Sequence, residues 1–346
     1  MLVHMKNKID RELTKFIKEI DVTYSLSKIS PLLFKSIKDF VLRDGKRIRP
    51  LLFCAGYLGF TKKPAPRLYT SALSLELLHD FLLVHDDIID KSKTRRGKPS
   101  MHQMLNNHLK NYHKIKFNGQ DLSIVVGDVM YAIAINAFLS IKEDFNRKEK
   151  ALKKFIEAAI YTGSGEFIEL LSGIEDLDKI TKEQIYKIYD FKTAYYSFAS
   201  PLATGAILAG ASDNEVNKLF KYGVYLGRAF QIKDDILGLF SSERKIGKSN
   251  LSDLQEAKKT MLIWHAYYNS TKKDKSAIKI AFSKTKVDKN DLSLIRKIVT
   301  ASGALDYTKN EVIQLLHKAK KTLLSSKIRL RYKELLNRYS CDILHL

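Results

Sequence analysis

The sequence of 346 residues contains 45% hydrophobic and 28% charged residues, which is typical of a folded globular protein and excludes a disordered chain. Only 6 prolines and 16 glycines interrupt it, and this scarcity of breaks favours long helices. The two cysteines, Cys54 and Cys341, match neither a disulfide framework nor a zinc pattern, so we expect a reducing, cytoplasmic location.

The formal net charge of +22 would suit a nucleic acid, an anionic membrane surface or phosphorylated substrates. Much of the excess lies in 142–154, 271–286 and 318–333, where lysines and apolar residues alternate at helical spacing, as on solvated outer faces. No nucleic-acid-binding motif accompanies them, so we predict no such partner. The start of the chain lacks a signal-peptide core, and the most apolar window, Leu122 to Leu139, is interrupted by Asp128. We therefore predict no membrane-spanning segment.

Apolar residues recur at helical spacing along most of the chain, and no strand-like alternation recurs. We predict one all-α domain covering residues 1–346 without an internal linker. We expect Pro201 to kink or interrupt the helix that contains it. The predicted helices cover residues 10–20, 31–42, 67–89, 122–141, 150–171, 179–209 and 214–240, and the chain is again helical from 288 to its end.

The most informative stretch of the sequence is HDDIID, which ends the apolar helix predicted over 67–89. Asp86 and Asp90 are four residues apart and therefore share a helix face, while Asp87 lies about a third of a turn away. Mg²⁺ prefers such hard oxygen ligands, commonly taking one or two carboxylates together with water and substrate phosphates. A solvated acidic helix end is the alternative reading. The apolar flanks and the basic pair Arg95 and Arg96 favour a metal site.

Basic side chains gather in the turn between the helices predicted over 31–42 and 67–89. Lys46, Arg47 and Arg49 surround Gly45 and precede Pro50, where a new helix would begin. Cationic side chains and backbone N–H groups at a helix N-terminus form an anion site, for which phosphate is a natural ligand. On its own, a basic turn of this kind is more often an ordinary surface loop.

A second acidic pair lies far along the chain, in FQIKDDILG. Gln231 is three and four residues before Asp234 and Asp235, so these side chains share a helix face. Lys192 lies on another apolar helix, and a lysine in such surroundings needs an anion or a position at the edge. His79 lies two turns before Asp86 on the same face, although a histidine there is more often an ordinary core residue.

Two acidic clusters, a surplus of cations and apolar walls suit two phosphorylated substrates with hydrocarbon parts. Mg²⁺ and the cations would stabilise the diphosphate that leaves an allylic substrate. The double bond of a second substrate would then attack the carbocation. Water must be excluded from that cation, so we expect the site deep in the cavity of an antiparallel helix bundle.

These residues resemble those of the trans-isoprenyl diphosphate synthases, the polyprenyl synthetase family, in motif order from about Arg43 to Thr260. The matching elements are GKRxRP, the helix histidine, DDxxD with RRG, the KT pair, FQxxDD, and a GK followed by D…KKT. The family's fold is the all-α isoprenoid synthase bundle. The resemblance implies a cytoplasmic homodimer that uses three Mg²⁺ ions, for which Mn²⁺ would substitute, and condenses isopentenyl diphosphate with allylic diphosphates.

The resemblance also assigns a role to each matching residue. Asp86 and Asp90 would ligate two Mg²⁺ ions and Asp234 a third, and with Lys192 they form the expected catalytic set. The residues expected to bind isopentenyl diphosphate are Lys46, Arg49, His79 and Arg96. Those expected to contact the allylic diphosphate are Arg95, Lys192, Gln231, Lys248 and Lys258, with Thr193 positioning the cation. The proton lost at the end would go to the released diphosphate.

The chain departs from the family pattern at two motifs. Gly238 replaces the last aspartate of the second motif, which removes one carboxylate. Glu166 and Glu169 replace the glutamine and aspartate of the family's GQxxDL, which leaves the extra charge of Glu166 without an evident partner.

Product length in this family depends on the residues four and five positions before the first motif, here Leu82 and Phe81. Leu82 lies beneath Asp86 by helix geometry, whereas the role of Phe81 follows from the resemblance alone. The pattern is similar to that of archaeal-type geranylgeranyl diphosphate synthases. We predict a C20 product, with C15 and then C25 as alternatives.

Three other functions fit parts of the sequence. A terpene cyclase would need one acidic motif but not the second diphosphate site, against which Lys46, Arg49 and Arg96 argue. A non-catalytic regulatory subunit usually lacks motif carboxylates, whereas both pairs are present here. A basic helical nucleic-acid binder would show salt-dependent binding without Mg²⁺-dependent chemistry.

Overall fold

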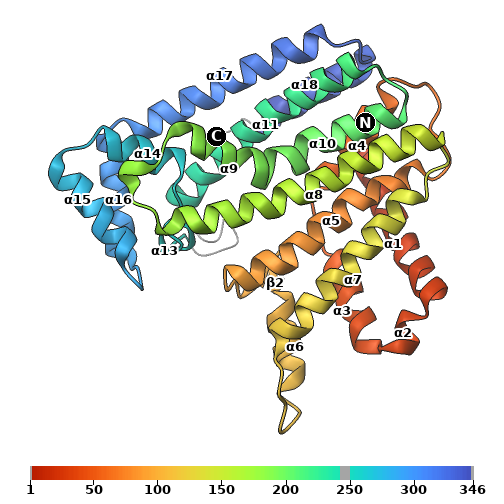
Figure 1. Ribbon diagram of the computed structural model, residues 1–346, viewed down its shortest axis with the longest axis horizontal. Coiled ribbons are helices and arrows are strands. Elements are labelled where there is room, and N and C mark those ends of the chain that lie inside the picture. Colours follow the sequence, from red (N-terminus) through yellow and green to blue (C-terminus); the bar gives the residue numbers. More distant parts are fainter. Residues whose placement is uncertain (1, 242–249, 344–346) are drawn as a thin grey trace. The chain divides into compact units, whose positions relative to one another are not determined.

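The computed structural model describes residues 2–241 and 250–343. Helices account for most of these residues, which confirms the all-α prediction (Figure 1). Within the described residues the strands are one pair of two-residue segments. The chain packs into two compact units. Unit 1 comprises residues 1–153 and 204–211, and unit 2 comprises 154–203 and 212–346.

Unit 1 consists of helices from the first half of the chain and one β-hairpin. Its elements are α1 (Leu2–Tyr24), α2 (Leu26–Ile29), α3 (Pro31–Val41), α4 (Ile48–Leu58), α5 (Leu68–Ile89), β1 (Thr94–Arg95), β2 (Lys98–Pro99), α6 (Met101–Leu109) and α7 (Gly119–Leu139). The boundary between the units falls inside α8 (Phe145–Ile174) and again inside α10 (Ser200–Leu208).

Helix α5 is the centre of unit 1 because it is apolar on nearly every side. Leu73, Leu75, Leu77 and Leu78 are all completely buried, and a helix that is hydrophobic all round belongs inside a core. Burying each such side chain contributes about 1.5–3 kcal/mol. Helix α5 packs against α1, α4 and α7, and it lies beside α7 over much of its length (Figure 1). The core therefore fixes the helix that ends in HDDIID.

By length and composition alone, helix α7 could cross a membrane, but buried core helices of soluble proteins have the same length and composition. It begins with a capping box, in which the Asn118 side chain accepts hydrogen bonds from the backbone N–H groups of Gln120 and Asp121. Its buried residues recur every three or four positions, and it packs against α5 and α6. The opposite side exposes Ile124, Val125 and Leu139.

Unit 2 contains the remaining helices, which pack mainly against α11. Its elements after α8 are η1 (Leu177–Lys179), α9 (Lys182–Tyr189), η2 (Asp190–Ala199), α11 (Asp213–Phe240), α13 (Ser252–Gln255), α14 (Met261–Tyr268), α15 (Lys272–Ser283), α16 (Lys289–Ala301), α17 (Ala304–Ser325) and α18 (Leu330–Ile343), with the first residues of α10. Helix α11 packs against η2 and α17, and the hydroxyl of its buried Tyr222 donates to the Leu336 carbonyl of α18 at 2.9 Å.

The segment predicted as one helix over 179–209 differs from expectation. It contains a 3₁₀ turn, the α-helix α9, a π-helical stretch η2 and α10. Pro201 is the second residue of α10. The change from π-helical to α-helical hydrogen bonding comes just before it, between Ala199 and Ser200. The guanidinium of Arg228 on α11 binds both oxygens of Asp190 at 2.6 Å, which fixes the start of the π-helix. Such wide turns occur frequently at functional sites.

Candidate active site

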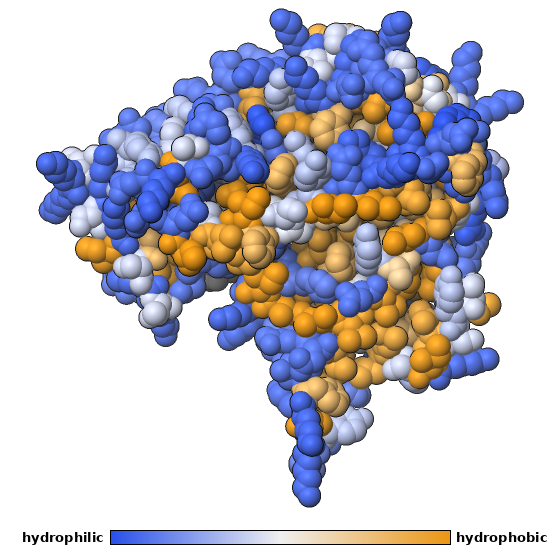
Figure 2. Space-filling view, viewed as in Figure 1, coloured by the Kyte–Doolittle hydropathy of each residue, from blue (hydrophilic) through white to orange (hydrophobic). Residues whose placement is uncertain are grey.

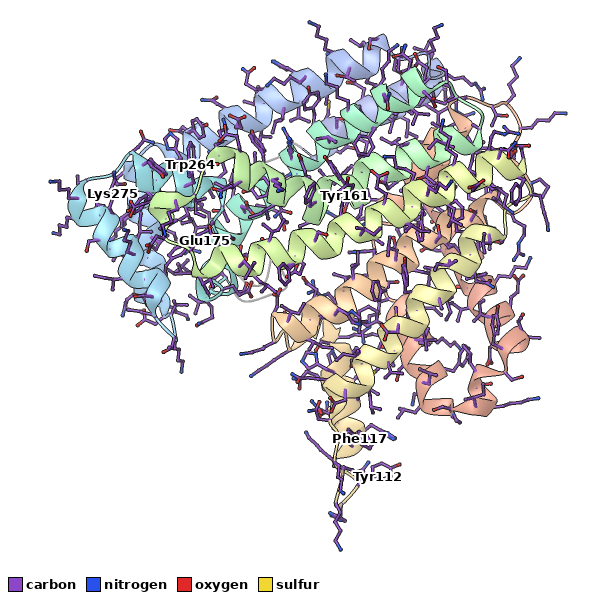
Figure 3. The ribbon with its side chains drawn as sticks, viewed as in Figure 1. Tyr112, Phe117, Tyr161, Glu175, Trp264 and Lys275 are labelled. Atoms are coloured by element: carbon purple, nitrogen blue, oxygen red, sulfur yellow. The ribbon has the colours of Figure 1, made fainter. Side chains whose placement is uncertain are left out.

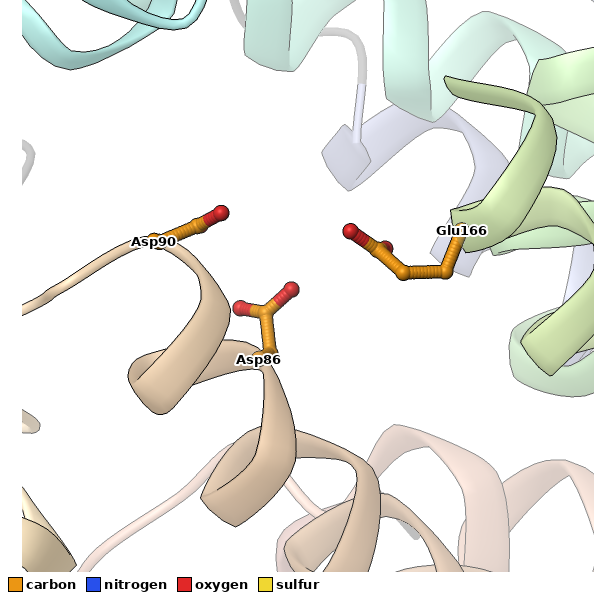
Figure 4. Close-up of side chains that lie close together, drawn as sticks. All are labelled: Asp86, Asp90 and Glu166. Atoms are coloured by element: carbon orange, nitrogen blue, oxygen red, sulfur yellow. The ribbon is translucent and has the colours of Figure 1, made fainter. Parts of the chain in front are cut away.

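The first acidic motif lies at the C-terminal end of α5 in unit 1. Asp86 and Asp90 are one turn apart, and each offers a carboxylate oxygen within 4.8 Å of the other (Figure 4). Both are partly exposed rather than sealed in the core. Figure 4 also draws Glu166 of α8, which belongs to unit 2. The spacing of Asp86 and Asp90 and their oxygen donors suit a hard divalent cation.

Asp87 differs from these two residues because it is completely buried. Its Oδ1 accepts hydrogen bonds from Nε and Nη2 of Arg95 at 2.8 and 2.6 Å, and Arg95 also reaches Asp86 at 3.2 Å. Burial raises the pKa of Asp87 to about 6, although the positive charge of Arg95 opposes the increase. Asp87 therefore holds Arg95 beside the motif instead of offering its own oxygens outward.

The RRG sequence forms the turn of a tight hairpin. Thr94 pairs with Pro99 and Arg95 with Lys98, which leaves Arg96 and Gly97 as a two-residue loop. Both loop residues have positive φ, 52° and 71°, as a type I′ turn requires. Gly97 adopts this conformation without a steric penalty, whereas Arg96 does so at some cost. The turn directs two neighbouring arginines to different partners.

Arg96 is held by two buried acidic residues of α5. Its Nη2 lies 3.1 Å from Oδ1 of Asp80 and 3.6 Å from Oε1 of Glu76. Burial raises the pKa of Asp80 to about 7, against the effect of the Arg96 charge. The pKa of the neighbouring His79 lies well below its usual value, because of burial and the charges of Arg49 and Arg96. His79 is therefore a neutral hydrogen-bonding group at neutral pH.

The three basic residues of GKRIRP have different environments. Lys46 is exposed and Arg49 is half-buried in the first turn of α4. Arg47 is buried and binds Glu76 at 2.7 Å and Asp10 at 2.9 Å. Lys46 and Arg49 are thus the two candidates for anion binding, whereas Arg47 joins α1, α4 and α5 inside unit 1.

The predicted chain-length residues also lie in unit 1. Phe81 packs edge-on against the ring of His85, with ring centroids 4.7 Å apart, and against Tyr131 of α7 at 5.1 Å. Leu82 is half-buried on the helix stripe that carries Asp86. Phe81 is therefore part of an aromatic group between α5 and α7, a neighbour relation that the sequence alone did not reveal.

In unit 2, the KT pair lies on the π-helix η2. Lys192 Nζ is 2.8 Å from Oε2 of Glu166 and also donates to Glu169, both on α8. A Cβ at Gly165 would lie 2.6 Å from the backbone nitrogen of Lys192, so only glycine permits this approach of α8 to η2. Lys192 therefore balances the charge of Glu166, which had no evident partner in the sequence.

A chain of hydrogen bonds connects the KT pair with the second acidic motif. The Thr193 hydroxyl donates to Oε1 of Gln231 at 2.7 Å, and Nε2 of Gln231 donates to Asp235 at 2.9 Å. The hydroxyl of the buried Tyr189 donates to Asp235 and accepts from the backbone N–H of Met261. Burial raises the pKa of Asp235 to about 8 despite these donors. This network positions Gln231 and Thr193.

The space above Gly238 contains the carboxylate of Asp253. A Cβ built at Gly238 would lie only 2.6 Å from Oδ2 of Asp253, closer than real Cβ contacts. Asp234 lies one turn before Gly238 on the same face of α11. Asp253 also lies 3.5 Å from Nζ of Lys258, which approaches Glu256 at 2.8 Å. Lys248, predicted to bind the allylic diphosphate, falls outside the described residues.

Several residues of these surroundings were not identified from the sequence. They are the buried acid Asp80, which holds Arg96, and Tyr189, which anchors Asp235. Acidic residues inside an apolar helix are a sequence signal for buried ion pairs, because such groups are almost never buried unpaired. No comparable local signal marks Tyr189, since its partners come from α11 and α14.

A search with models of protein families matches residues 30–299 to polyprenyl synthetase. The match covers most of the chain and includes all of the motifs described above. The chain belongs to the polyprenyl synthetase family. It is 30% identical over 298 residues to the geranylgeranyl diphosphate synthase of Saccharolobus solfataricus, covering 83% of this chain and 84% of the relative.

Other members of the family show similar relationships. The short chain isoprenyl diphosphate synthase of Methanocaldococcus jannaschii is 32% identical, covering 75% of this chain and 70% of that protein. The crystal structure of a Corynebacterium glutamicum geranylgeranyl pyrophosphate synthase, complexed with isoprenyl diphosphate and magnesium, has a TM-score of 0.90 and 26% identity. That alignment covers 100% of this chain and 99% of the other. The protein thus has the all-α isoprenoid synthase fold, as the resemblance implied.

Proposed function

We propose that this protein is a Mg²⁺-dependent short-chain trans-prenyltransferase that condenses isopentenyl diphosphate with allylic diphosphates to geranylgeranyl diphosphate. Its membership of the polyprenyl synthetase family supports the reaction class. The observation that carries the proposal is the Asp86–Asp90 pair, partly exposed at the end of a buried helix, with oxygens within 4.8 Å. These donors fit Mg²⁺, which would neutralise the departing diphosphate when bound.

In unit 1 we assign isopentenyl diphosphate to Lys46, Arg49, His79 and Arg96. Arg96 is already oriented by Asp80 and Glu76, so little conformational freedom is lost when it binds an anion. The low pKa of His79 leaves it neutral, and it therefore contributes a directed hydrogen bond rather than a charge. The charges at this position come from the arginines and Lys46.

For the allylic diphosphate we assign, from the resemblance to the family, Arg95, Lys192, Gln231, Lys248 and Lys258. Asp87 orients Arg95, and the two glutamates of α8 orient Lys192. Thr193, fixed by Gln231, would face the developing cation. Preorganised cations and dipoles of this kind stabilise charge separation without rearranging during the reaction.

The reaction needs no dedicated side-chain base, because the released diphosphate can accept the proton that is lost. The allylic C–O bond breaks with its electron pair going to the diphosphate, and the π electrons of isopentenyl diphosphate form the new C–C bond. A proton then leaves the carbon next to the new cation for the released diphosphate, and a double bond remains. The carboxylates of Asp86, Asp90 and Asp234 would hold three Mg²⁺ ions, and Mn²⁺ would substitute. The carboxylate of Asp253 lies in the space beside Gly238, where the family has its last aspartate.

Product length is assigned to Phe81, with Leu82 beside it. The contacts of Phe81 with His85 and Tyr131 give it support from two helices, as a floor against a growing hydrocarbon requires. Relatives in the family make products of neighbouring lengths. The Aeropyrum pernix protein, 30% identical over 81% of this chain, is a geranylfarnesyl diphosphate synthase.

We further propose that both units act as one catalytic domain and that the protein is a cytoplasmic homodimer. Each unit exposes large apolar side chains, and subunit contact would bury such surfaces. In unit 1 they include Ile124 and Leu139 of α7, and in unit 2 Leu170 and Ile174 of α8. The two cysteines are both free, as expected in a reducing compartment. Sedimentation equilibrium would give twice the monomer mass.

The function is tested by incubating the purified protein with labelled isopentenyl diphosphate, Mg²⁺ and a C5, C10 or C15 allylic diphosphate. We expect extractable labelled prenyl product with at least one primer, lost on adding EDTA and recovered with excess Mg²⁺. A terpene cyclase would instead convert an allylic diphosphate to a hydrocarbon without isopentenyl diphosphate. If no primer gives a labelled product, the proposal is wrong.

A further inference from the structure

The loop between α6 and α7 exposes apolar and basic side chains together. Every residue from 110 to 117 is exposed, and Tyr112, Ile115 and Phe117 are 55%, 43% and 47% accessible. The hairpin of α6 and α7 projects from unit 1, and Tyr112 and Phe117 lie at its end (Figure 3). We call residues 110–117 the tip. Three exposed large apolar side chains within six positions form a local apolar patch, and such patches commonly mark interaction sites.

The charged side chains of the tip are all positive. Residues 110–117 contain three lysines and no aspartate or glutamate. Lys110, Lys114 and Lys116 belong to the tip and alternate with its apolar residues, so hydrophilic and hydrophobic surfaces adjoin there (Figure 2). Within the described ranges, none of these three lysines forms an ion pair with a carboxylate. The positive charge of the tip is therefore available to an external anion.

The base of the tip is well fixed. The Gly119 backbone N–H donates to Oδ1 of Asn106 on α6 at 2.7 Å, and the Asn118 side chain caps α7. The Tyr112 backbone N–H donates to the Leu109 carbonyl at 3.0 Å, continuing the end of α6. The Tyr112 ring also contacts that of His108, with centroids 5.6 Å apart. The apolar side chains are thus presented by an ordered turn.

We propose that the tip binds the surface of a lipid bilayer that contains anionic headgroups. Tyrosine and phenylalanine partition into the headgroup region, where the apolar part of each ring is buried. Lysines insert their alkyl chains among the lipids and keep their ammonium groups at the phosphates. Each lysine near an anionic surface strengthens binding about fivefold. Three apolar anchors give only peripheral, reversible attachment, so anionic lipid is required.

A bilayer fits this surface better than single-stranded nucleic acid or a second copy of the chain. Nucleic-acid sites commonly combine stacking aromatic rings with arginine side chains. The tip has lysines but no arginine, and one of its three large apolar side chains is the aliphatic Ile115, which does not stack on bases. A second copy would bring the same positive charge to the contact. The proposal does not depend on the proposed reaction, although an enzyme making an amphiphile would gain from releasing it at a bilayer.

The test is sedimentation of the full-length protein with sucrose-loaded vesicles, either of phosphatidylcholine alone or with about one third phosphatidylglycerol. We expect binding to the anionic vesicles only, weakened by salt. The variant Tyr112→Ser/Ile115→Ser/Phe117→Ser should bind at least about tenfold more weakly. The variant Lys110→Gln/Lys114→Gln/Lys116→Gln should bind about 100-fold more weakly.

A matched control removes three positive charges elsewhere. Lys318, Lys320 and Lys321 are exposed on α17 in unit 2, and their replacement by glutamine should leave vesicle binding within about threefold of the natural chain. Circular dichroism and sedimentation velocity check folding and oligomeric state. Three results would each overturn the proposal: no binding by the natural chain, equal binding by the tip variants, or tip variants that change only self-association or oligonucleotide binding.

Discussion

Restoring the family's third acidic residue by Gly238→Asp should weaken this protein. The Cβ of a side chain at 238 would lie 2.6 Å from Oδ2 of Asp253 on α13, so the Asp253 side chain must turn away. Turning one flexible side chain costs little, so the main cost is the repulsion between two adjacent carboxylates, about 1–3 kcal/mol near the protein surface. In a chain of this size we expect a fall in Tm of about 2–5 °C. We also expect a higher Mg²⁺ requirement.

The pairing of the two positions is tested with a double-mutant cycle. Asp253→Ala alone should raise the Mg²⁺ concentration for half-maximal activity, because it removes a carboxylate that has no substitute at Gly238. The double variant Gly238→Asp/Asp253→Ala should lie closer to the natural chain than either single variant, with a coupling energy of at least about 1 kcal/mol. Metal-dependent shifts in Tm give a second measurement that does not depend on turnover.

The control for this cycle is Gly163→Asp on α8. Gly163 is exposed, and a Cβ there would meet nothing within 4 Å, so the same substitution should change Tm little. If the Gly238 and Asp253 effects simply add, or if Gly238→Asp alone improves the Mg²⁺ requirement, then Asp253 does not occupy the functional place of the missing aspartate.

The remaining predictions concern the first motif, product length and pH. Asp86→Ala should reduce turnover at least about 10³-fold with an unchanged circular dichroism spectrum. The control Asp306→Ala, at an exposed position, should retain activity. Full activity in Asp86→Ala would refute the role of Asp86 as a metal ligand. Phe81→Ala should lengthen the product by one or more C5 units, since it opens the contact with Tyr131, and an unchanged length by mass spectrometry would remove Phe81 as the floor. The pKa of Asp235 is raised to about 8 from an unfolded value of 3.8, so the folded protein takes up a proton, and stability in EDTA should fall as pH rises between those values. Asp235→Asn should remove this pH-dependent loss of folding free energy, which is at most about 6 kcal/mol. Identical pH profiles of Tm for the natural chain and the variant would show that Asp235 is not the group responsible.

Sequence patterns predicted the long helices well, because their apolar residues repeat with the helical period. The predicted helix 67–89 matches α5 (Leu68–Ile89), and 214–240 matches α11 (Asp213–Phe240). The hairpin around Arg96 was not predicted, since strands of two residues show no alternation. The π-helix was missed for a related reason, because contacts such as Arg228 with Asp190 come from 38 residues away.

The site residues could be named from motif order, but their partners could not. Glu166 had no evident counter-charge in the sequence, and the structure places Lys192 at 2.8 Å. Gly238 looked like a simple loss, whereas Asp253 fills the space beside it. In both cases the partner lies on another helix or loop, and only tertiary packing brings the two together. The division into two units likewise depends on tertiary packing that no local pattern encodes.

The central claim is tested most directly by mass spectrometry of the product formed from a C15 allylic diphosphate, isopentenyl diphosphate and Mg²⁺. Our account predicts one Mg²⁺-dependent addition that stops at C20, with one diphosphate released for each isopentenyl unit consumed. Elongation that continues to C25 would contradict Phe81 as the limit of a C20 enzyme. Absence of any condensed product, with this and shorter primers, would contradict prenyl transfer itself.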